Sequence, residues 1–217
     1  MSFKAIIFDL DGTLLDTLKD LAYSVNAVLR EKGCEEHPVD AYRYFVGDGI
    51  EALVQRAFPE SELARIDFKE LVKTVKEEYG RRWADYTVPY PGVKEMLDFF
   101  EDRMIPKAIF SNKPQEFVTL TVETLLPQWN FIAMQGIREG VPRKPDPAGA
   151  LAVAETMRFK PEETVYLGDT ITDMKTAAAG KFYPVGALWG FRPADELREG
   201  GALMLAEKPW DVTGLFK

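Results

Sequence analysis

Cysteine and histidine are almost absent from this chain, which has one of each, Cys34 and His37. A single cysteine excludes an intramolecular disulfide and fits a reducing compartment. The two residues form a C-x-x-H pair, but the chain has no second cysteine or histidine to complete a zinc site. We therefore interpret both as ordinary loop residues.

Positive charge is also in deficit, with 27 Lys and Arg against 35 Asp and Glu and a formal net charge of -8. A nucleic acid or an anionic membrane attracts basic surfaces, so we expect neither as a partner. The chain shows no apolar run as long as a membrane span and no signal-peptide pattern, and we expect a cytoplasmic protein. The nucleotide-binding patterns G-x-G-x-x-G and G-x-x-x-x-G-K-[ST] are missing as well.

Short apolar runs rich in β-branched and aromatic residues recur along the chain, and the segments between them have helical patterning. The runs cover residues 4–8, 105–110, 131–135, 164–168 and 182–188. Alternating strands and helices are typical of a parallel sheet with helices on both faces. The sequence therefore predicts an α/β protein with a Rossmann-like parallel sheet.

Residues 16–87 depart from this alternation. Their apolar positions follow helical spacing, as at Leu18, Leu21 and Val25 or at Leu71 and Val75, and no strand is evident. A connection of roughly 70 residues is far too long to be structureless within a compact domain. We therefore predict an all-helical cap subdomain at 16–87, inserted into a catalytic core formed by 1–15 and 88–217.

Charged and polar side chains follow the apolar runs, at the strand ends where open parallel sheets bind their ligands. They are Asp9 and Asp11 after the first run, Ser111, Asn112 and Lys113 after the second, Lys144 shortly after the third, and Asp169 and Asp173 after the fourth. Residues two apart in an extended chain point to the same face, so Asp9 and Asp11 converge. We expect all these groups to meet at one edge of the sheet.

Carboxylates brought together in this way repel one another unless a cation lies among them. Oxygen ligands without histidine or cysteine suit Mg²⁺. Lys144, Ser111 and the backbone N–H groups near Asp11 and Gly12 would form an anion site beside the metal, which indicates a phosphate ligand. One carboxylate of the Asp9–Asp11 pair can then attack phosphorus, while the other protonates the leaving oxygen and later deprotonates water.

Four segments in this order, FDLDGTLLDT, FSNK, RKPDP and GDTITD, resemble the four motifs of the haloacid dehalogenase superfamily of phosphotransferases. Within the superfamily, FVGDGIEALVQRAF at 45–58 and ALWGFRPADEL at 187–197 are similar to the phosphoglycolate phosphatase group. The resemblance implies a Mg²⁺-dependent phosphatase for a small phosphomonoester, with 2-phosphoglycolate as the favoured substrate. The protein would act as a monomer or a homodimer.

Matched by motif position, the resemblance implies a role for each residue. Asp9 would be the nucleophile and a metal ligand, and Asp11 the general acid and base, with its backbone carbonyl on the metal. Asp169 would bind Mg²⁺ directly, and Asp173 would complete the metal site by orienting a metal-bound water or Lys144. The residues at the phosphoryl group would be Ser111, Asn112, Lys144, Gly12 and Thr13, and a cap loop of Gly47, Asp48 and Gly49 would contact the leaving group.

Other functions fit part of this pattern. A sugar-phosphate mutase of the same superfamily would use the same aspartyl phosphate, and a pyrophosphatase or nucleotidase would differ only in the leaving group. A dehalogenase would not need Asp11. A receiver-like module that binds partners when phosphorylated also uses an acidic cluster and Mg²⁺, but the chain length and the inserted segment disfavour it.

Overall fold

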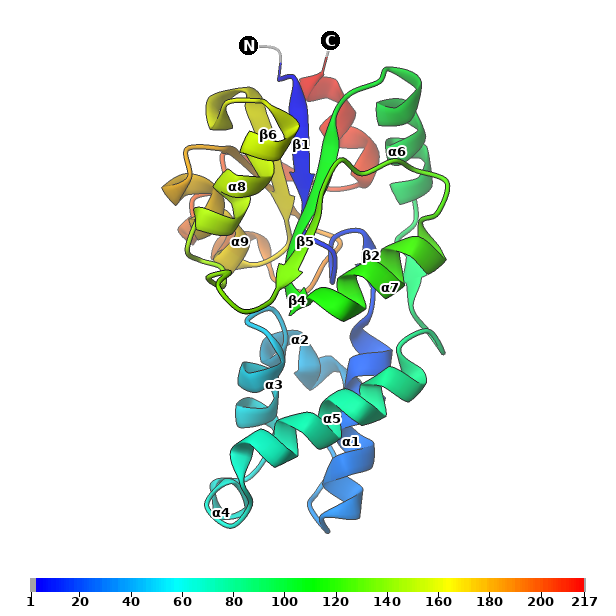
Figure 1. Ribbon diagram of the computed structural model, residues 1–217, viewed down its shortest axis with the longest axis vertical. Helices are drawn as coiled ribbons and strands as arrows, with labels where there is room; N and C mark the ends of the chain where they lie inside the picture. Colours follow the sequence, from blue (N-terminus) through cyan, green and yellow to red (C-terminus); the bar gives the residue numbers. More distant parts are fainter. Residues whose placement is uncertain (1–2, 217) are drawn as a thin grey trace. The chain divides into compact units, whose positions relative to one another are not determined.

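The computed structural model describes residues 3–216 and divides into two compact units. One unit, here called the α/β unit, combines Met1–Asp16 with Pro89–Lys217, and the other, the helical unit, is Thr17–Val88. The chain crosses between them at β2 (Leu15–Asp16) and β3 (Val88–Pro89), which pair as a two-stranded sheet. Figure 1 follows the chain through both units.

The α/β unit is built on a parallel sheet, which has six strands within residues 3–216. In spatial order the strands are β5 (Met134–Ile137), β4 (Lys107–Pro114), β1 (Ala5–Phe8), β6 (Thr164–Gly168), β7 (Tyr183–Ala187) and β8 (Met204–Ala206). Ile7 lies opposite Ala108 of β4 and Tyr166 of β6, so the first strand is central. The predicted α/β class with a parallel sheet is confirmed.

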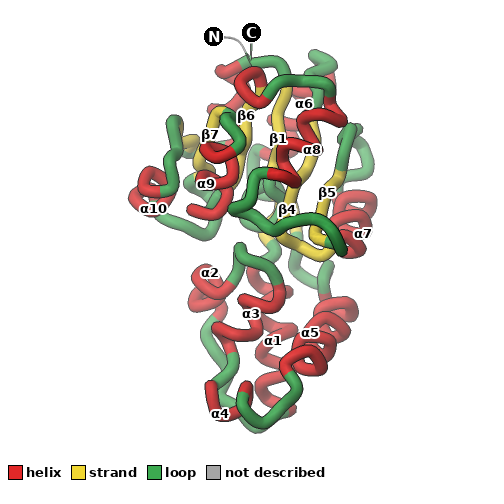
Figure 2. The backbone as a smooth tube through the Cα atoms, turned by 60° about the vertical axis from the view of Figure 1, so that its left-hand side comes forward, coloured by secondary structure: helices red, strands yellow, loops and turns green. Residues whose placement is uncertain are grey.

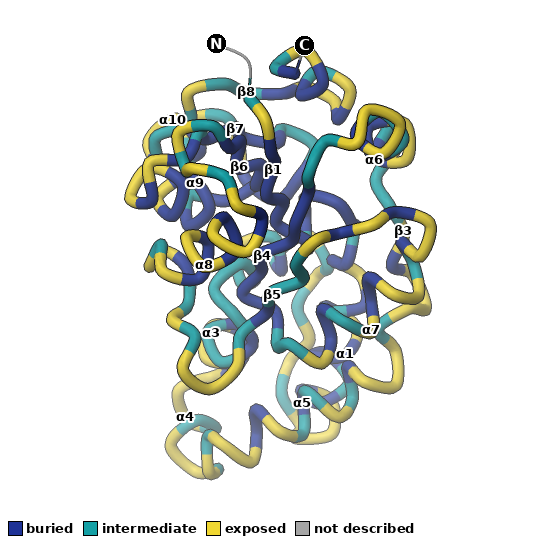
Figure 3. Tube along the Cα trace, turned by 45° about the horizontal axis from the view of Figure 1, so that its top comes forward, coloured by how far each residue is buried: buried dark blue, intermediate teal, exposed yellow. Residues whose placement is uncertain are grey.

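Alternate residues of the strands face two different helical layers. Ile6 and Phe8 of β1 belong to the core cluster that includes α6 (Val93–Asp102), α7 (Gln115–Leu125) and η3 (Pro209–Leu215), while Ile7 packs with α8 (Ala148–Met157) and α9 (Ile171–Ala179). Because side chains alternate along a strand, the continuous apolar run AIIF supplies both layers. Figure 2 shows helices flanking the strands, and Figure 3 shows β1, β4 and β6 buried between them. The short elements η2 (Pro161–Glu163) and α10 (Ala194–Glu199) complete this unit.

The helical unit is organised around two long helices, α1 (Leu18–Glu31) and α5 (Phe68–Arg82), which pack against each other. Their buried residues recur three or four positions apart, as at Leu18, Ala22 and Val25, which places them on one helical face. The Asp67 side chain accepts a hydrogen bond from the amide of Lys69 and so caps the start of α5. The remaining elements are η1 (Val39–Ala41), α2 (Tyr42–Phe45), α3 (Ile50–Ala57) and α4 (Glu60–Leu63).

A buried carboxylate joins the beginning and the end of the helical unit. Asp20 in the first turn of α1 is 1% exposed and accepts hydrogen bonds from the Tyr86 amide, the Thr87 amide and the Thr87 hydroxyl. These donors precede β3, where the chain returns to the α/β unit. Asp20 therefore holds together the two segments that adjoin the crossing.

The lone histidine has a packing role. A ring nitrogen of His37 lies 2.7 Å from the Ala57 carbonyl oxygen, and the ring contacts Tyr42 and Phe45 edge to face. Cys34 is partly exposed and unbridged. Among the described residues, no helix is both long enough and apolar enough to span a membrane.

The extent of β4 and the presence of β8 differ from the sequence-based expectation. The second apolar run continues as β4 to Pro114, so Ser111, Asn112 and Lys113 lie in the strand itself. They lie beyond Ile109, the last residue of β4 that pairs with β1, in a stretch where the register with β5 also shifts. The edge strand β8 was not predicted, because it is only three residues long and has too short an apolar run to stand out from the surrounding loops.

Candidate functional site

The first site segment leaves the sheet at the end of β1. Asp9 follows Phe8 directly, is 5% exposed, and its amide donates to the Leu167 carbonyl of β6 at 2.9 Å. The chain then turns at Gly12, which has a φ of 86°, a backbone conformation that glycine adopts without strain and other residues do not. A Cβ at Gly12 would lie 2.3 Å from Asp169 Oδ2, so glycine also allows the turn to approach that carboxylate.

Asp169 follows β6 and has both carboxylate oxygens held by the protein. The Thr13 hydroxyl donates to Oδ1 at 3.0 Å, and the Phe191 amide donates to Oδ2 at 2.8 Å. The Trp189 indole N–H donates in turn to the Thr13 carbonyl at 2.9 Å. The loop after β7 therefore fixes both the first turn and Asp169.

Lys144 lies between two further carboxylates. Its ammonium is 2.9 Å from Asp9 Oδ1 and 2.6 Å from Asp173 Oδ1, and its side chain is 1% exposed. Asp173 uses its other oxygen to accept from the amide and the hydroxyl of Thr170, which forms a capping box at the start of α9. The helix cap thus orients the carboxylate that holds the lysine.

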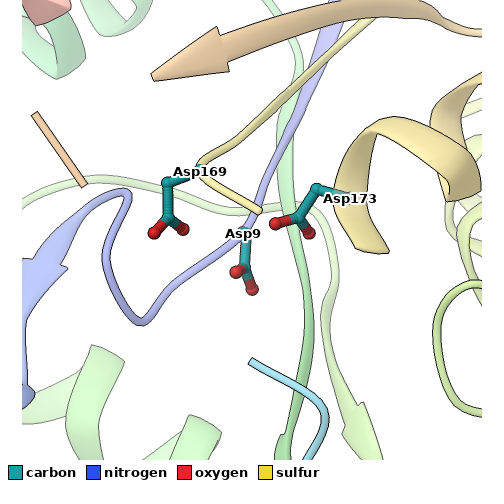
Figure 4. Close-up of side chains that lie close together, drawn as sticks. All are labelled: Asp9, Asp169 and Asp173. Carbon is teal, nitrogen blue, oxygen red and sulfur yellow. The ribbon is translucent and has the colours of Figure 1, made fainter. Parts of the chain in front are cut away.

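The carboxylates of Asp9, Asp169 and Asp173 converge, as Figure 4 shows. One oxygen of each lies within 4.8 Å of the others, and all three residues are buried. They come from the ends of β1 and β6 and from the first turn of α9. This is the meeting of acidic strand ends that the sequence predicts.

Asp11 points toward another cation. Lys113 donates to its two carboxylate oxygens at 2.9 and 3.2 Å, so the Asp11 side chain is separate from the group of three. Asp11 is the more exposed partner, with 19% of its side chain accessible against 3% for Lys113. The two carboxylates at this strand end therefore have different partners: Asp9 lies among the other acids and contacts Lys144, whereas Asp11 is paired with Lys113.

The polar residues of β4 support the lysines. The Asn112 side chain accepts from the Lys144 amide at 2.9 Å and donates to the Lys144 carbonyl at 3.4 Å. The Ser111 hydroxyl is buried and accepts from the Lys113 amide at 3.3 Å. Asn112 thus fixes the backbone that carries Lys144, a supporting position rather than one that presents its amide to an anion.

Burial and mutual repulsion perturb the titration of the acidic group. Burial and then repulsion from Asp173 raise the pKa of Asp9, Lys144 opposes them, and the net result is a pKa of about 7. Burial and then Asp173 and Asp9 also hold the pKa of Asp169 well above its usual value. Burial lowers the pKa of Lys144, but Asp173 and Asp9 outweigh that effect and keep it well above its normal range. The site therefore favours an additional positive charge.

The residues present fit a divalent metal ion. The four carboxylates, Asp9, Asp11, Asp169 and Asp173, face two ammonium groups, those of Lys113 and Lys144, which leaves two negative charges uncompensated. The donors are oxygens only, as hard cations prefer. The cluster of Asp9, Asp169 and Asp173 could hold such an ion.

Comparison with known proteins places the chain in a family. The model of the haloacid dehalogenase-like hydrolase family matches residues 6–182. The chain belongs to the haloacid dehalogenase-like hydrolases. It is 31% identical over 207 residues to a phosphoglycolate phosphatase of Psychrobacter arcticus, covering 92% of this chain and 89% of that protein. A phosphoglycolate phosphatase of Aquifex aeolicus is 29% identical over 188 residues, covering 87% and 86%.

A solved structure agrees with these relatives. A provisionally named phosphoglycolate phosphatase from Lactobacillus delbrueckii superposes with a TM-score of 0.91 at 26% identity, covering 100% of this chain and 99% of that one. The predicted enzyme class, a haloacid dehalogenase-type phosphatase resembling the phosphoglycolate phosphatases, is confirmed.

Like Asn112, Gly12 and Thr13 were predicted to bind phosphate in this hydrolase but direct polar groups elsewhere. The Gly12 amide donates to the Leu15 carbonyl at 2.9 Å, and the Thr13 hydroxyl donates to Asp169. These bonds favour roles in shaping the turn. The predicted cap-loop residues Gly47, Asp48 and Gly49 lie between α2 and α3 of the helical unit, where both glycines have positive φ and Asp48 is paired with Arg56.

Sequence reasoning missed two parts of the site. The sequence analysis placed Lys113 at the strand end together with Ser111 and Asn112, but it did not identify Asp11 as its partner. Trp189 and Phe191 follow the last predicted strand, whose carboxyl end adjoins that of β6, and this adjacency is the signal that could have found them. In both cases the missed residues form hydrogen bonds that position a predicted carboxylate, and none of the predicted carboxylates is excluded from the site.

Proposed function

We propose that this hydrolase is a Mg²⁺-dependent phosphatase that cleaves a small phosphomonoester through an aspartyl phosphate on Asp9, with 2-phosphoglycolate as the best candidate substrate. The observation that carries the proposal is the convergence of Asp9, Asp169 and Asp173, with Lys144 held between Asp9 and Asp173, which supports a buried site for a cation and an anion together. The names of the similar proteins supply the substrate.

The metal would be held by carboxylate oxygens of Asp9 and Asp169 and by the backbone carbonyl of Asp11. Asp173 has both oxygens engaged by Lys144 and Thr170, which suits it to orienting the lysine or a water on the metal. When bound, Mg²⁺ would neutralise the carboxylates and the phosphoryl oxygens, so that a dianionic substrate can approach an acidic protein.

Asp9 is the nucleophile in this proposal. One of its oxygens is held by Lys144, and its other oxygen attacks phosphorus while the bond from phosphorus to the ester oxygen breaks. Lys144 and the Ser111 hydroxyl hold the phosphoryl oxygens during the transfer. The product of this step is an aspartyl phosphate and an alcohol.

Asp11 transfers the protons. It gives a proton to the departing ester oxygen and later removes one from the water that attacks the aspartyl phosphate, which regenerates Asp9 and releases inorganic phosphate. The separate positions of Asp9 and Asp11 support this division, because Asp9 contacts Lys144 among the clustered carboxylates and Asp11 is paired with Lys113 outside that cluster.

We assign substrate reading to a cap formed by residues 16–87, with Gly47, Asp48 and Gly49 as the contacting loop. The support is the position of the loop at the start of α3, where Gly49 provides the N-cap with a φ of 90°. Asp48→Ala should alter kcat/KM by different factors for different leaving groups, whereas an equal change for all of them would refute this assignment.

The decisive experiment is a kcat/KM panel with 2-phosphoglycolate, sugar phosphates, nucleoside monophosphates and pyrophosphate, measured with Mg²⁺ and after chelation. We expect Mg²⁺-dependent phosphate release, highest for 2-phosphoglycolate, with no phosphate transfer between sugar positions. Asp9→Asn should abolish turnover while circular dichroism shows an unchanged fold, and Asp11→Asn should reduce kcat by ~10²–10⁴-fold. Turnover by Asp9→Asn at the wild-type rate, or turnover without any divalent metal, would contradict the proposal.

The same panel separates the alternatives. Isomerisation of a sugar phosphate without net phosphate release would indicate a mutase. A phosphorylated Asp9 that persists for hours would indicate a receiver-like module, because Asp11 should hasten its hydrolysis.

A further inference from the structure

Lys113 is a buried cation at the site for which the proposed mechanism has no use. Its ammonium donates to both oxygens of Asp11, and only 3% of its side chain is exposed. Burying an ammonium is unfavourable unless it is paired, so this lysine is held in place by the charge on Asp11. Asp11 is the more exposed of the two, and the pair therefore borders the accessible part of the site.

The two buried lysines have separate positions. Lys144 lies between Asp9 and Asp173, where the phosphoryl group would bind. Lys113 adjoins Asp11, which in the proposed mechanism touches the ester oxygen of the leaving group. Two hydrogen bonds of about 2.7–3.0 Å each are enough to connect that ester oxygen, through Asp11, with the Lys113 ammonium. A substituent on the leaving group therefore comes within reach of Lys113.

We propose that Lys113 is a specificity-determining residue that selects phosphomonoesters whose leaving group carries a carboxylate close to the ester oxygen. The inference rests on the proposed phosphatase function. A substrate carboxylate takes over part of the pairing with the ammonium, so that Lys113 remains neutralised and Asp11 turns toward the ester oxygen. A neutral leaving group offers no replacement, and Lys113 then keeps Asp11 away from that oxygen.

The charges of the site support this selection. An acidic protein with a formal charge of -8 has no general attraction for a substrate that carries a phosphate and a carboxylate. Because Lys144 is engaged with the nucleophile side, a second anionic group needs its own cation, and Lys113 is in the right place. An ammonium already desolvated by the protein strengthens such a contact.

The test compares two substrates that differ only in this charge, 2-phosphoglycolate and its neutral analogue 2-hydroxyethyl phosphate, with Mg²⁺ present. The variants are Lys113→Gln, which removes the charge, and Lys113→Arg, which keeps it. Lys107→Gln is the matched control, since Lys107 is a buried lysine on the same strand, paired with Glu101 rather than with the site. Thermal unfolding of each variant is measured alongside kcat/KM.

We expect the wild type and Lys107→Gln to prefer 2-phosphoglycolate, and Lys113→Gln to lose on the order of 10²-fold in that preference, as expected for a hydrogen bond to a charged group. Lys113→Arg should keep part of it. If Lys113→Gln is folded and both substrates slow equally, or if the wild type does not discriminate, the inference is wrong. If Lys113→Gln does not fold, Lys113→Met, which retains the apolar stem, decides by the same ratio.

These results also separate the two proposals. A wild type that hydrolyses neither ester, nor any other phosphomonoester, contradicts the phosphatase function itself. Hydrolysis of both esters with an unchanged ratio in the Lys113 variants contradicts only the selection by charge.

Discussion

Replacing the proposed nucleophile, Asp9, should stabilise the metal-free protein relative to wild type, and this difference should grow as the pH rises. Asp9 is buried beside Asp173 and Asp169, and burial together with repulsion from Asp173 raises its pKa from 3.8 to about 7 despite the opposing effect of Lys144. Asp9→Asn removes the ionisable group and keeps a side chain of similar shape. The comparison is made in EDTA, where no metal ion can compensate the carboxylate.

The sign follows from the two pKa values. Below the unfolded value of 3.8, Asp9 is protonated in both states and its ionisation costs nothing. Between that value and about 7 the unfolded chain has lost the proton that the folded chain keeps, so each pH unit disfavours folding by about 1.36 kcal/mol. Two units, from about pH 5 to about pH 7, amount to about 2–3 kcal/mol. The Asp9→Asn variant has no such ionisation. Its unfolding free energy relative to wild type should therefore increase by about 2–3 kcal/mol between pH 5 and pH 7.

The assay is urea unfolding of both proteins at the two pH values, with the difference in unfolding free energy as the readout. Asp98→Asn is the control, because the hydrogen bonds from Lys94 and Trp129 lower the pKa of Asp98 and leave it ionised in both states over this range. Its difference from wild type should stay constant. If the difference in unfolding free energy between Asp9→Asn and wild type is also constant, or falls as the pH rises, the assigned environment of Asp9 is refuted.

Three further outcomes follow from contacts in the two units. Lys144→Met should lower the unfolding free energy by about 3–5 kcal/mol at neutral pH, because it leaves buried carboxylates unpaired; a loss below 1 kcal/mol in urea unfolding would count against the pairing. Gly12→Ala should abolish the rise in melting temperature on adding Mg²⁺, because the new Cβ would overlap Asp169. Gly33→Ala is the control: Gly33 also has a positive φ, but a Cβ there would have no neighbour within 4 Å, so this variant should retain the rise. Asp20→Ala should cost about 2–4 kcal/mol by leaving the buried amide and hydroxyl of Thr87 unpaired, and should speed proteolysis near β3; cleavage at the wild-type rate would show that this carboxylate does not hold the crossing.

The sequence was most informative where apolar runs are sharply bounded. The run at 164–168 coincides with β6, because this central strand is buried along its whole length and ends at a glycine before Asp169. The run at 131–135 begins too early, since β5 is an edge strand whose Gln135 and Gly136 do not follow a burial pattern. The prediction at this edge failed because pairing there depends on β4 rather than on local hydrophobicity.

The acidic residues of the candidate site could be predicted from the sequence, but their pairings could not. Strand order brings Asp9 and Asp169 together, and parallel topology alone leads to that expectation. The partner of Asp11 depends on how β4 continues past β1, and the clamp on Asp169 depends on the loop after β7. Such contacts involve rotamers and turns that sequence spacing does not specify.

The central position of β1 has a consequence for synthesis. Thr13 and Asp169, which form one hydrogen bond in the folded protein, are 156 residues apart, so β1 cannot pair with β6 until residues 164–168 have been synthesised. Contacts of such long sequence separation form slowly, and an unpaired apolar strand edge invites association with other chains. A nascent chain arrested before residue 164 would therefore depend on a chaperone to stay monomeric.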